Sequence, residues 1–314
     1  MRSHPVSTSL VAALAILVGV TACSDSAGVD PGDPAVLSAA EVADIGDTFE
    51  EEADLSFGAL FHHGTLGWFD LSMPSLKALF PPGTRAHLPS PLIACLSASP
   101  LPIDDPDGDG VPTDLTISFD PAGCEFTNPK RGARFALTGS VNVSDPLPNS
   151  PGYDLMEVLT DFGHTFTTGN GTHTAQLTRN GTRSVGQAAN ILTAAEQLVS
   201  ARSGTLGPEK TVTSDWVVEF TGDADIMHGD PLPGGSITVE GAWTLTRGPQ
   251  VREFVMTTVT PLIYDASCTS DRPSRRIAAG ELHAELVVDG VLQGTLALVW
   301  AGCGTAPTRQ FTPA

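Results

Sequence analysis

Basic residues are scarce in this chain of 314 residues, and lysine occurs only at Lys77, Lys130 and Lys210. The formal net charge is −20 at pH 7. Nucleic-acid binding depends on Lys and Arg side chains that neutralise phosphates, and such a surface would have to be built against the negative field of the whole chain. The composition therefore argues against a nucleic-acid partner.

Common catalytic signatures are also missing. The sequence has no G-x-S-x-G nucleophile elbow, no H-E-x-x-H zinc motif and no G-x-x-x-x-G-K phosphate loop. The adjacent pair His62-His63 lacks the i, i+4 spacing of a zinc protease. Carboxylate pairs of the glycosidase type meet only in space, so a carbohydrate- or lipid-active hydrolase stays an alternative. We expect a protein without enzymatic activity.

Long apolar runs are confined to the N-terminus. Arg2 precedes an apolar run from Val6 to Val20, which is too short to span a bilayer and ends in small residues. This arrangement is typical of secretory signals. We expect residues 1–22 to be a signal peptide. Residues 23–37 are small, acidic and rich in Pro and Gly, which predicts a flexible tether.

The end of the apolar run is more specific. Val20-Thr21-Ala22-Cys23 resembles the lipobox of bacterial lipoproteins. The resemblance implies that Cys23 is acylated, for example with palmitate, and that the chain is cut before it. Two or more acyl chains hold a protein stably on a membrane. Enteric bacteria retain lipoproteins with Asp at the next position in the inner membrane, so Ser24 favours the outer membrane. We expect a lipid-anchored protein of the cell envelope.

Four cysteines remain once Cys23 is assigned to lipid. They are Cys95, Cys124, Cys268 and Cys303. An even number in an exported chain predicts disulfides, and three pairings are open. We predict Cys95 with Cys124 and Cys268 with Cys303, because each pair flanks one short group of expected strands. Zinc is the alternative, but no C-x-x-C pair supports it.

Alternation of apolar and polar residues predicts a mainly β fold. It is clearest in four segments: 115–119, 135–143, 216–220 and 237–245. Asn170-Gly171, Asn180-Gly181 and Asp289-Gly290 suit the tight turns of hairpins. We predict an antiparallel curved sheet or a sandwich, built of hairpins, in a disulfide-stapled β domain over residues 95–314. Trp216, Trp243 and Trp300 occupy alternating positions, which favours core packing over a sugar-stacking platform.

Two of the alternating segments have glycine at their third inward position. These are Gly139 and Gly241. A central glycine in a strand marks a bend, a bulge or a close approach of the backbone, so the pair predicts a curved sheet or a duplicated half. A curved sheet that encloses an apolar ligand would make the protein a hydrophobic-ligand or lipoprotein carrier, which is a second alternative function.

Helical signals occur at two places. Ser38 and Glu41 have the spacing of a capping box and are followed by an apolar stripe, which predicts a short N-terminal helix over 38–58. Residues 59–94 contain apolar clusters broken by prolines and predict an irregular lead-in. Between Ala188 and Arg202, apolar residues repeat at helical spacing. This pattern predicts one further helix, unless the context of the sheet overrides it.

An aspartate-rich loop is the sharpest chemical motif. Asp105, Asp107, Asp109 and Asp114 alternate with Gly and Pro, as in the first half of an EF-hand loop. The twelfth position holds Thr116 in place of a bidentate Glu, and a strand is expected to follow where an EF-hand has a helix. We consider these aspartates candidate calcium ligands. The alternative is an acidic surface turn.

The order of these motifs resembles a group of uncharacterised bacterial cell-envelope lipoproteins of environmental Gram-negative phyla. The motifs follow one another in the order lipobox, acidic loop, strand Thr116–Asp120 and terminal Gly302-Cys303, and downstream of the lipobox the resemblance spans about residues 90–305. It implies a secreted β domain and carries no activity or site residues. In those proteins the last cysteine is commonly followed by Asp and a short strand. Here Gly304 follows, so we expect a truncated last strand.

Together these features predict a membrane-anchored binding or structural module. Its partner would be a ligand in the envelope or outside the cell.

Overall fold

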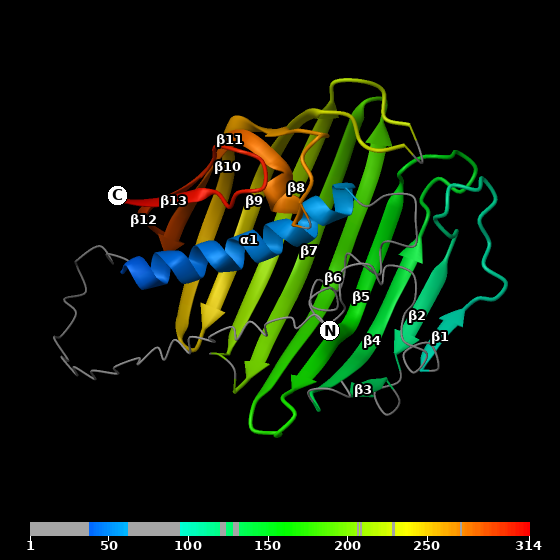
Figure 1. Cartoon of the computed structure of the whole chain (residues 1–314), viewed down its shortest axis with the longest axis horizontal. Coiled ribbons are helices and arrows are strands. Elements are labelled where there is room, and N and C mark those ends of the chain that lie inside the picture. Colours follow the sequence, from blue (N-terminus) through cyan, green and yellow to red (C-terminus); the bar gives the residue numbers. More distant parts are fainter. Residues whose placement is uncertain are drawn as a thin grey trace, which may run out of the picture. The chain divides into compact units, whose positions relative to one another are not determined.

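Antiparallel β-hairpins make up most of the computed structural model of this protein (Figure 1). The structure describes residues 38–61, 95–119, 124–127, 132–205, 207, 209–227, 230–270 and 272–314. The expected signal peptide, tether and nearly all of the lead-in lie outside the described residues. No helix within the described ranges is long and apolar enough to cross a membrane.

The described strands form one sheet, and their order in the sheet follows the sequence. The path runs β1-β2-β4-β5-β6-β7-β8-β9-β10-β11-β12-β13, with β3 paired to β4 beside it. The bounds are β1 (Leu96–Ser99), β2 (Leu115–Phe119), β3 (Glu125–Thr127), β4 (Arg134–Ser144), β5 (Leu155–Thr167), β6 (Thr174–Ala188), β7 (Ile191–Gly204), β8 (Lys210–Gly222), β9 (Gly235–Arg247), β10 (Gln250–Tyr264), β11 (Ile277–Val288), β12 (Val291–Trp300) and β13 (Thr308–Pro313). The predicted mainly β fold is confirmed as a single sheet.

The predicted alternation is confirmed in the strands where it was strongest. The inward residues of β2, β4, β8 and β9 are buried, and their neighbours in sequence face the other way. Asp289-Gly290 joins β11 to β12 with φ of +51° and +77°, as a two-residue type I′ turn requires. Asn170-Gly171 lies in the loop between β5 and β6. After Cys303 a further short strand, β13, pairs with β12.

Two local predictions were wrong. The segment 188–202, expected to be helical, is the last residue of β6, a turn at 189–190 and most of strand β7, which pairs with β6 on one side and β8 on the other. Asn180-Gly181, expected to be a turn, lies inside β6. A Cβ at Gly181 would come within 2.0 Å of the Gln197 carbonyl oxygen, so this glycine permits close approach of β7 instead of a reversal.

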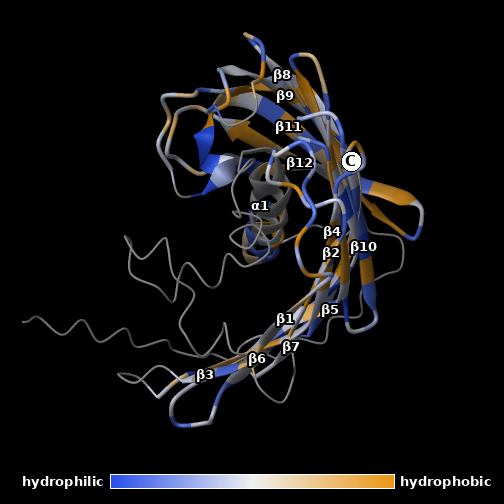
Figure 2. Ribbon diagram, turned by 90° about the vertical axis from the view of Figure 1, so that its right-hand side faces the viewer, coloured by the Kyte–Doolittle hydropathy of each residue, from blue (hydrophilic) through white to orange (hydrophobic). Residues whose placement is uncertain are grey.

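The N-terminal helix α1 (Ala39–Phe61) lies on the concave side of the bent sheet (Figure 2). The predicted capping box is present, because the Ser38 backbone N–H donates to Glu41 Oε2 at 2.9 Å and the Glu41 N–H donates to Ser38 Oγ at 3.3 Å. The helix contacts β7, β8, β13 and the 3-10 helix η1 (Pro273–Arg276). It thereby fills the bend of the sheet from β7 onwards.

Apolar packing holds α1 against the sheet. The ring of Phe49 meets Trp216 edge-on at a centroid distance of 6.0 Å and Trp243 at 6.2 Å. Trp243 in turn stacks on Phe254 at 4.3 Å. These residues are buried in the larger of two hydrophobic clusters. Core packing is therefore the role of Trp216 and Trp243, as predicted, and Trp300 is buried in the same cluster. Such a core contributes several kcal/mol for each large side chain, roughly 3 to 5 by the cost of truncation.

Ion pairs surround this apolar contact. The buried carboxylate of Glu50 accepts from Arg272 at 2.9 Å, Arg275 at 3.1 Å and Arg309 at 2.9 Å. Nearer the start of α1, Glu41 accepts from Arg252 at 2.7 Å. The arginines belong to β10, η1 and β13 or lie next to them, so the acidic face of the helix is matched to cations from the far end of the chain.

Glycines permit the curvature of the sheet, in two different ways. Gly139, with φ of +82°, sits at a register shift between β4 and β5, opposite Asp161. Gly241, with φ of +139°, keeps its register, but a Cβ there would lie 2.3 Å from the Asp215 carbonyl oxygen. The predicted bulge is confirmed at Gly139, and the predicted close backbone approach is confirmed at both glycines, because a Cβ at Gly139 would lie 2.2 Å from the Asp161 carbonyl oxygen.

Candidate functional site

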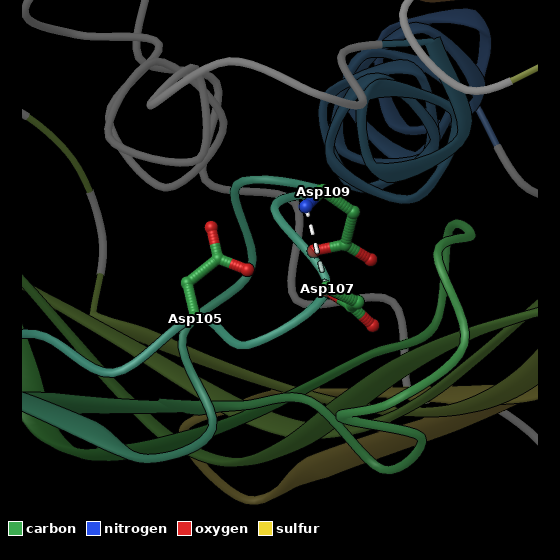
Figure 3. A group of neighbouring side chains, drawn as sticks. All are labelled: Asp105, Asp107 and Asp109. Atoms are coloured by element: carbon green, nitrogen blue, oxygen red, sulfur yellow. Dashed lines mark hydrogen bonds between the residues drawn. The ribbon is translucent and has the colours of Figure 1, made fainter.

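The aspartate-rich motif lies in the loop between β1 and β2 (Figure 3). Gly108 and Gly110, with φ of +75° and +89°, turn the backbone so that both of their N–H groups donate to Asp105, each at 3.0 Å. The Asp109 N–H donates to Asp107 Oδ1 at 3.4 Å, and Asp109 Oδ1 accepts from Val111 at 2.8 Å. The loop is therefore folded around its own carboxylates, which explains the alternation of Asp with Gly.

This folding brings three of the four candidate calcium ligands together. One oxygen each from Asp105, Asp107 and Asp109 lies within 4.8 Å of the others. Ca²⁺ binds oxygens at about 2.3 to 2.6 Å, so ligands on opposite sides of the ion lie about 5 Å apart. Asp114 is outside this group, and its Oδ1 accepts from the Asn142 amide at 2.6 Å. The spacing of three carboxylates suits a hard cation.

A second loop, between β4 and β5, packs against the first. The Asp145 N–H donates to the Pro112 carbonyl at 2.9 Å, and the Gly152 N–H donates to Asp109 Oδ2 at 3.2 Å. Asp145 is only 5% exposed, and Asp109 is buried. The pKa of Asp145 is raised, chiefly by burial and further by the nearby charges of Asp109, Asp107 and Asp154. The two loops therefore share one partly buried acidic region.

Two carboxylate oxygens of this region are left without hydrogen bonds. Among the described residues, Oδ2 of Asp107 and Oδ2 of Asp145 are buried and accept from no donor. Sequence reasoning found Asp107 through its motif but missed Asp145. The only signal for Asp145 was its position in Ser144-Asp145-Pro146, a turn sequence that follows a predicted strand.

The predicted disulfides are present. Cys95 is bonded to Cys124 and Cys268 to Cys303. The first bond joins the start of β1 to the residue before β3, and so fixes the sheet edge from which the aspartate-rich loop projects. The second joins the segment before η1 to the turn that follows β12. Zinc is therefore excluded as the role of these thiols.

A buried ionic row was not anticipated from the sequence. Glu157, Arg183 and Glu196 face each other on β5, β6 and β7, and each side chain is 2% exposed. Arg183 lies 3.4 Å from Glu157 Oε2 and 3.2 Å from Glu196 Oε2, and Ser214 donates to Glu196 at 2.8 Å. Burial raises the pKa of Glu157, and Arg183 only partly offsets this. Because these carboxylates are out of reach of solvent, the row suits a structural role better than catalysis.

The predicted lipidation site and the histidines lie partly inside and partly outside the described residues. Cys23, His62 and His63 lie outside the described residues. Two further histidines lie in the described part of the chain with partners of their own: His283 is paired with Glu281 at 2.6 Å, and His164 stacks on Phe135 at 5.0 Å. Neither histidine belongs to the carboxylate group in the aspartate-rich loop.

Comparison with known proteins gives no further guidance. No protein-family model, curated protein or solved structure matches this chain.

Proposed function

We propose that this chain is an exported, lipid-anchored protein of the bacterial cell envelope, attached through Cys23, and that its sheet serves as a non-enzymatic binding or structural module. The anchor rests on Val20-Thr21-Ala22-Cys23 and the apolar run before it. The disulfides fit an exported chain, since such bonds persist in oxidising compartments.

The packing of α1 is the observation that carries the proposal. This helix is the first described element after the predicted tether, and it fills the concave side of the sheet with Phe49 while Glu50 binds three arginines. Because the predicted tether leads into a firmly packed helix, a mechanical force on the membrane anchor would be transmitted through α1 to the sheet. The helix also occupies the surface that a carrier would need for an apolar ligand, which argues against the carrier alternative.

The convex face remains for a partner. It carries exposed apolar side chains on several strands, among them Val199 on β7, Val217 on β8 and Val255 on β10. They alternate with threonines and carboxylates. Non-obligate protein interfaces have the same mixture of apolar and polar area as other protein surface, so this face is compatible with binding a partner.

Labelling with palmitate tests the anchor. The full chain, expressed in a Gram-negative host, should incorporate labelled palmitate and sediment with outer membranes, whereas Cys23→Ala should do neither. Ser24→Asp is the matched control: it should keep the label but move to the inner membrane if the enteric sorting rule applies. An unlabelled, soluble wild-type protein would contradict the anchor. Turnover of envelope polysaccharide or lipid, abolished by one carboxylate substitution, would contradict the non-enzymatic role.

A further inference from the structure

We propose that the convex face of β8–β11 binds a basic amphipathic segment of a partner protein, which deepens and rests on the binding role proposed above. Exposed carboxylates and valines meet on this face. The basic side chains of the same part of the chain lie on the opposite face.

One row of directly opposed residues shows the pattern most clearly. It crosses the face from β8 to β11 in the order Asp215, Ala242, Val255 and Glu285. The two ends are exposed carboxylates, and Val255 between them is 38% exposed. Neighbouring strands lie about 4.8 Å apart, so the two carboxylates enclose an apolar centre over roughly 14 Å.

The rows on either side contain the same mixture. In one row Val217, which is 44% exposed, pairs with Glu240. In the other row Glu253 pairs with Val287. Within the described residues, none of the exposed carboxylates on this face forms an ion pair; they are Asp215, Glu219, Glu240, Glu253 and Glu285.

The matching cations are used on the other side of the sheet. In the described chain from β8 to the C-terminus, every Lys and Arg side chain except Arg276 donates to α1 on the concave side, namely Lys210, Arg247, Arg252, Arg272, Arg275 and Arg309. Arg276 donates to the Ser270 carbonyl oxygen at 2.9 Å. His283 faces the convex side but is paired with Glu281. The carboxylates of the convex face therefore have no Lys or Arg of these strands to offset them.

This separation of charge selects among the possible occupants. A second copy packed through the same face would bring the same carboxylates, and lipid headgroups or nucleic acids would bring phosphates, so each would be repelled. A small cation alone would leave Val217 and Val255 in contact with water. A protein segment with basic residues on both sides of an apolar stripe complements the carboxylates and covers the valines.

Binding of a synthetic amphipathic peptide of leucine and lysine to the purified full chain tests the proposal. The fluorescence anisotropy of the labelled peptide measures the affinity, which should fall as NaCl is raised, because exposed charges are screened. Replacing the lysines by glutamates, or the leucines by serines, should weaken binding at least about tenfold, since each change removes one of the two complementary features. Absence of binding, or equal binding of the lysine–serine peptide, would overturn the proposal.

Substitutions on the convex face locate the binding. Asp215→Asn, Glu240→Gln and Glu285→Gln, combined in one variant, should weaken binding of the leucine–lysine peptide at least about tenfold. Val217→Thr with Val255→Thr, which keeps side-chain size and a preference for strands, should weaken it at least about threefold. All five side chains are exposed, so both variants should unfold at nearly the wild-type Tm.

A control variant of equal net charge separates the face from the acidity of the whole chain. Glu209→Gln, Asp230→Asn and Asp289→Asn change exposed carboxylates in loops beyond the ends of the strands. Together they should alter the affinity by less than about twofold, because their charges are far from the face and screened. Equal weakening by this variant and by the acidic-face variant would overturn the proposal. A chain that binds the peptide but incorporates no palmitate would refute the anchor alone, and a lipidated chain that does not bind it would refute this inference alone.

Discussion

At the scale of single residues, the capping carboxylate Glu41 should make the stability of the domain depend on pH. The hydrogen bond from Arg252, with those from Ser38, lowers the pKa of Glu41 from 4.5 to about 2. A carboxyl whose pKa is lowered by folding stabilises the folded state above its unfolded pKa. That contribution is lost as the pH falls from about 4.5 through about 2.

Glu41→Gln should therefore lower the free energy of unfolding at pH 7 by about 1 kcal/mol, a modest amount because the Glu41 side chain is 40% exposed and screened by water. The difference from wild type should shrink below about pH 4.5 and be mostly gone at pH 2. Chemical denaturation of both proteins between pH 2 and pH 7 measures it. A difference that stays constant over this range would show that the charge of Glu41 contributes nothing.

At the scale of elements, Phe49 should account for much of the attachment of α1. Phe49→Ala removes a ring packed between Trp216 and Trp243, and should cost about 3 to 5 kcal/mol of stability. Because both tryptophans lose a neighbour, their fluorescence should shift to longer wavelength in the folded protein.

Ala40→Ser, on the exposed side of the first turn, is the matched control and should change the stability by less than about 0.5 kcal/mol. If Phe49→Ala were equally mild, the packing of α1 would be dispensable to the sheet.

Sequence patterns predicted helices and strands correctly where the apolar residues are buried and the polar residues are exposed. The capping box and the alternation in β2, β4, β8 and β9 follow local rules, so they could be recognised. In β7 the rule fails because Glu196 and Ser200 face the core while Val199 is exposed. These inversions hide the period of two and leave an accidental helical spacing.

The candidate site was predictable only in part for a similar reason. Asp105, Asp107 and Asp109 are close in sequence, and their motif is visible. Asp145 and the ionic row from Glu157 to Glu196 are assembled by pairing between strands and loops. No local pattern encodes which distant polar groups will meet.

At the scale of the whole described sheet, each strand pairs mainly with its neighbours in sequence. Strands that are distant in sequence are therefore connected only by contacts other than strand pairing. Helix α1 links distant strands, since it contacts the adjacent strands β7 and β8 and also β13 at one end of the sheet. The curvature that allows one helix to reach all three depends on close backbone approaches at glycines such as Gly241.

Gly241→Ala should therefore be far more damaging than an ordinary glycine substitution. Its Cβ would lie 2.3 Å from the Asp215 carbonyl oxygen and 2.5 Å from the Trp216 Cα, in addition to the strain of φ at +139°. Both atoms are backbone, so β8 would have to move away from β9. We expect the free energy of unfolding to fall by about 3 kcal/mol or more, from overpacking and left-handed strain together.

Gly290→Ala is the matched control, because Gly290 also has positive φ, +77°, but no atom lies within 4 Å of the added Cβ. It should lose only about 1 to 2 kcal/mol. Denaturant unfolding of both variants measures the difference, and equal losses would show that backbone strain alone, and not the close approach of β8 to β9, makes Gly241 necessary.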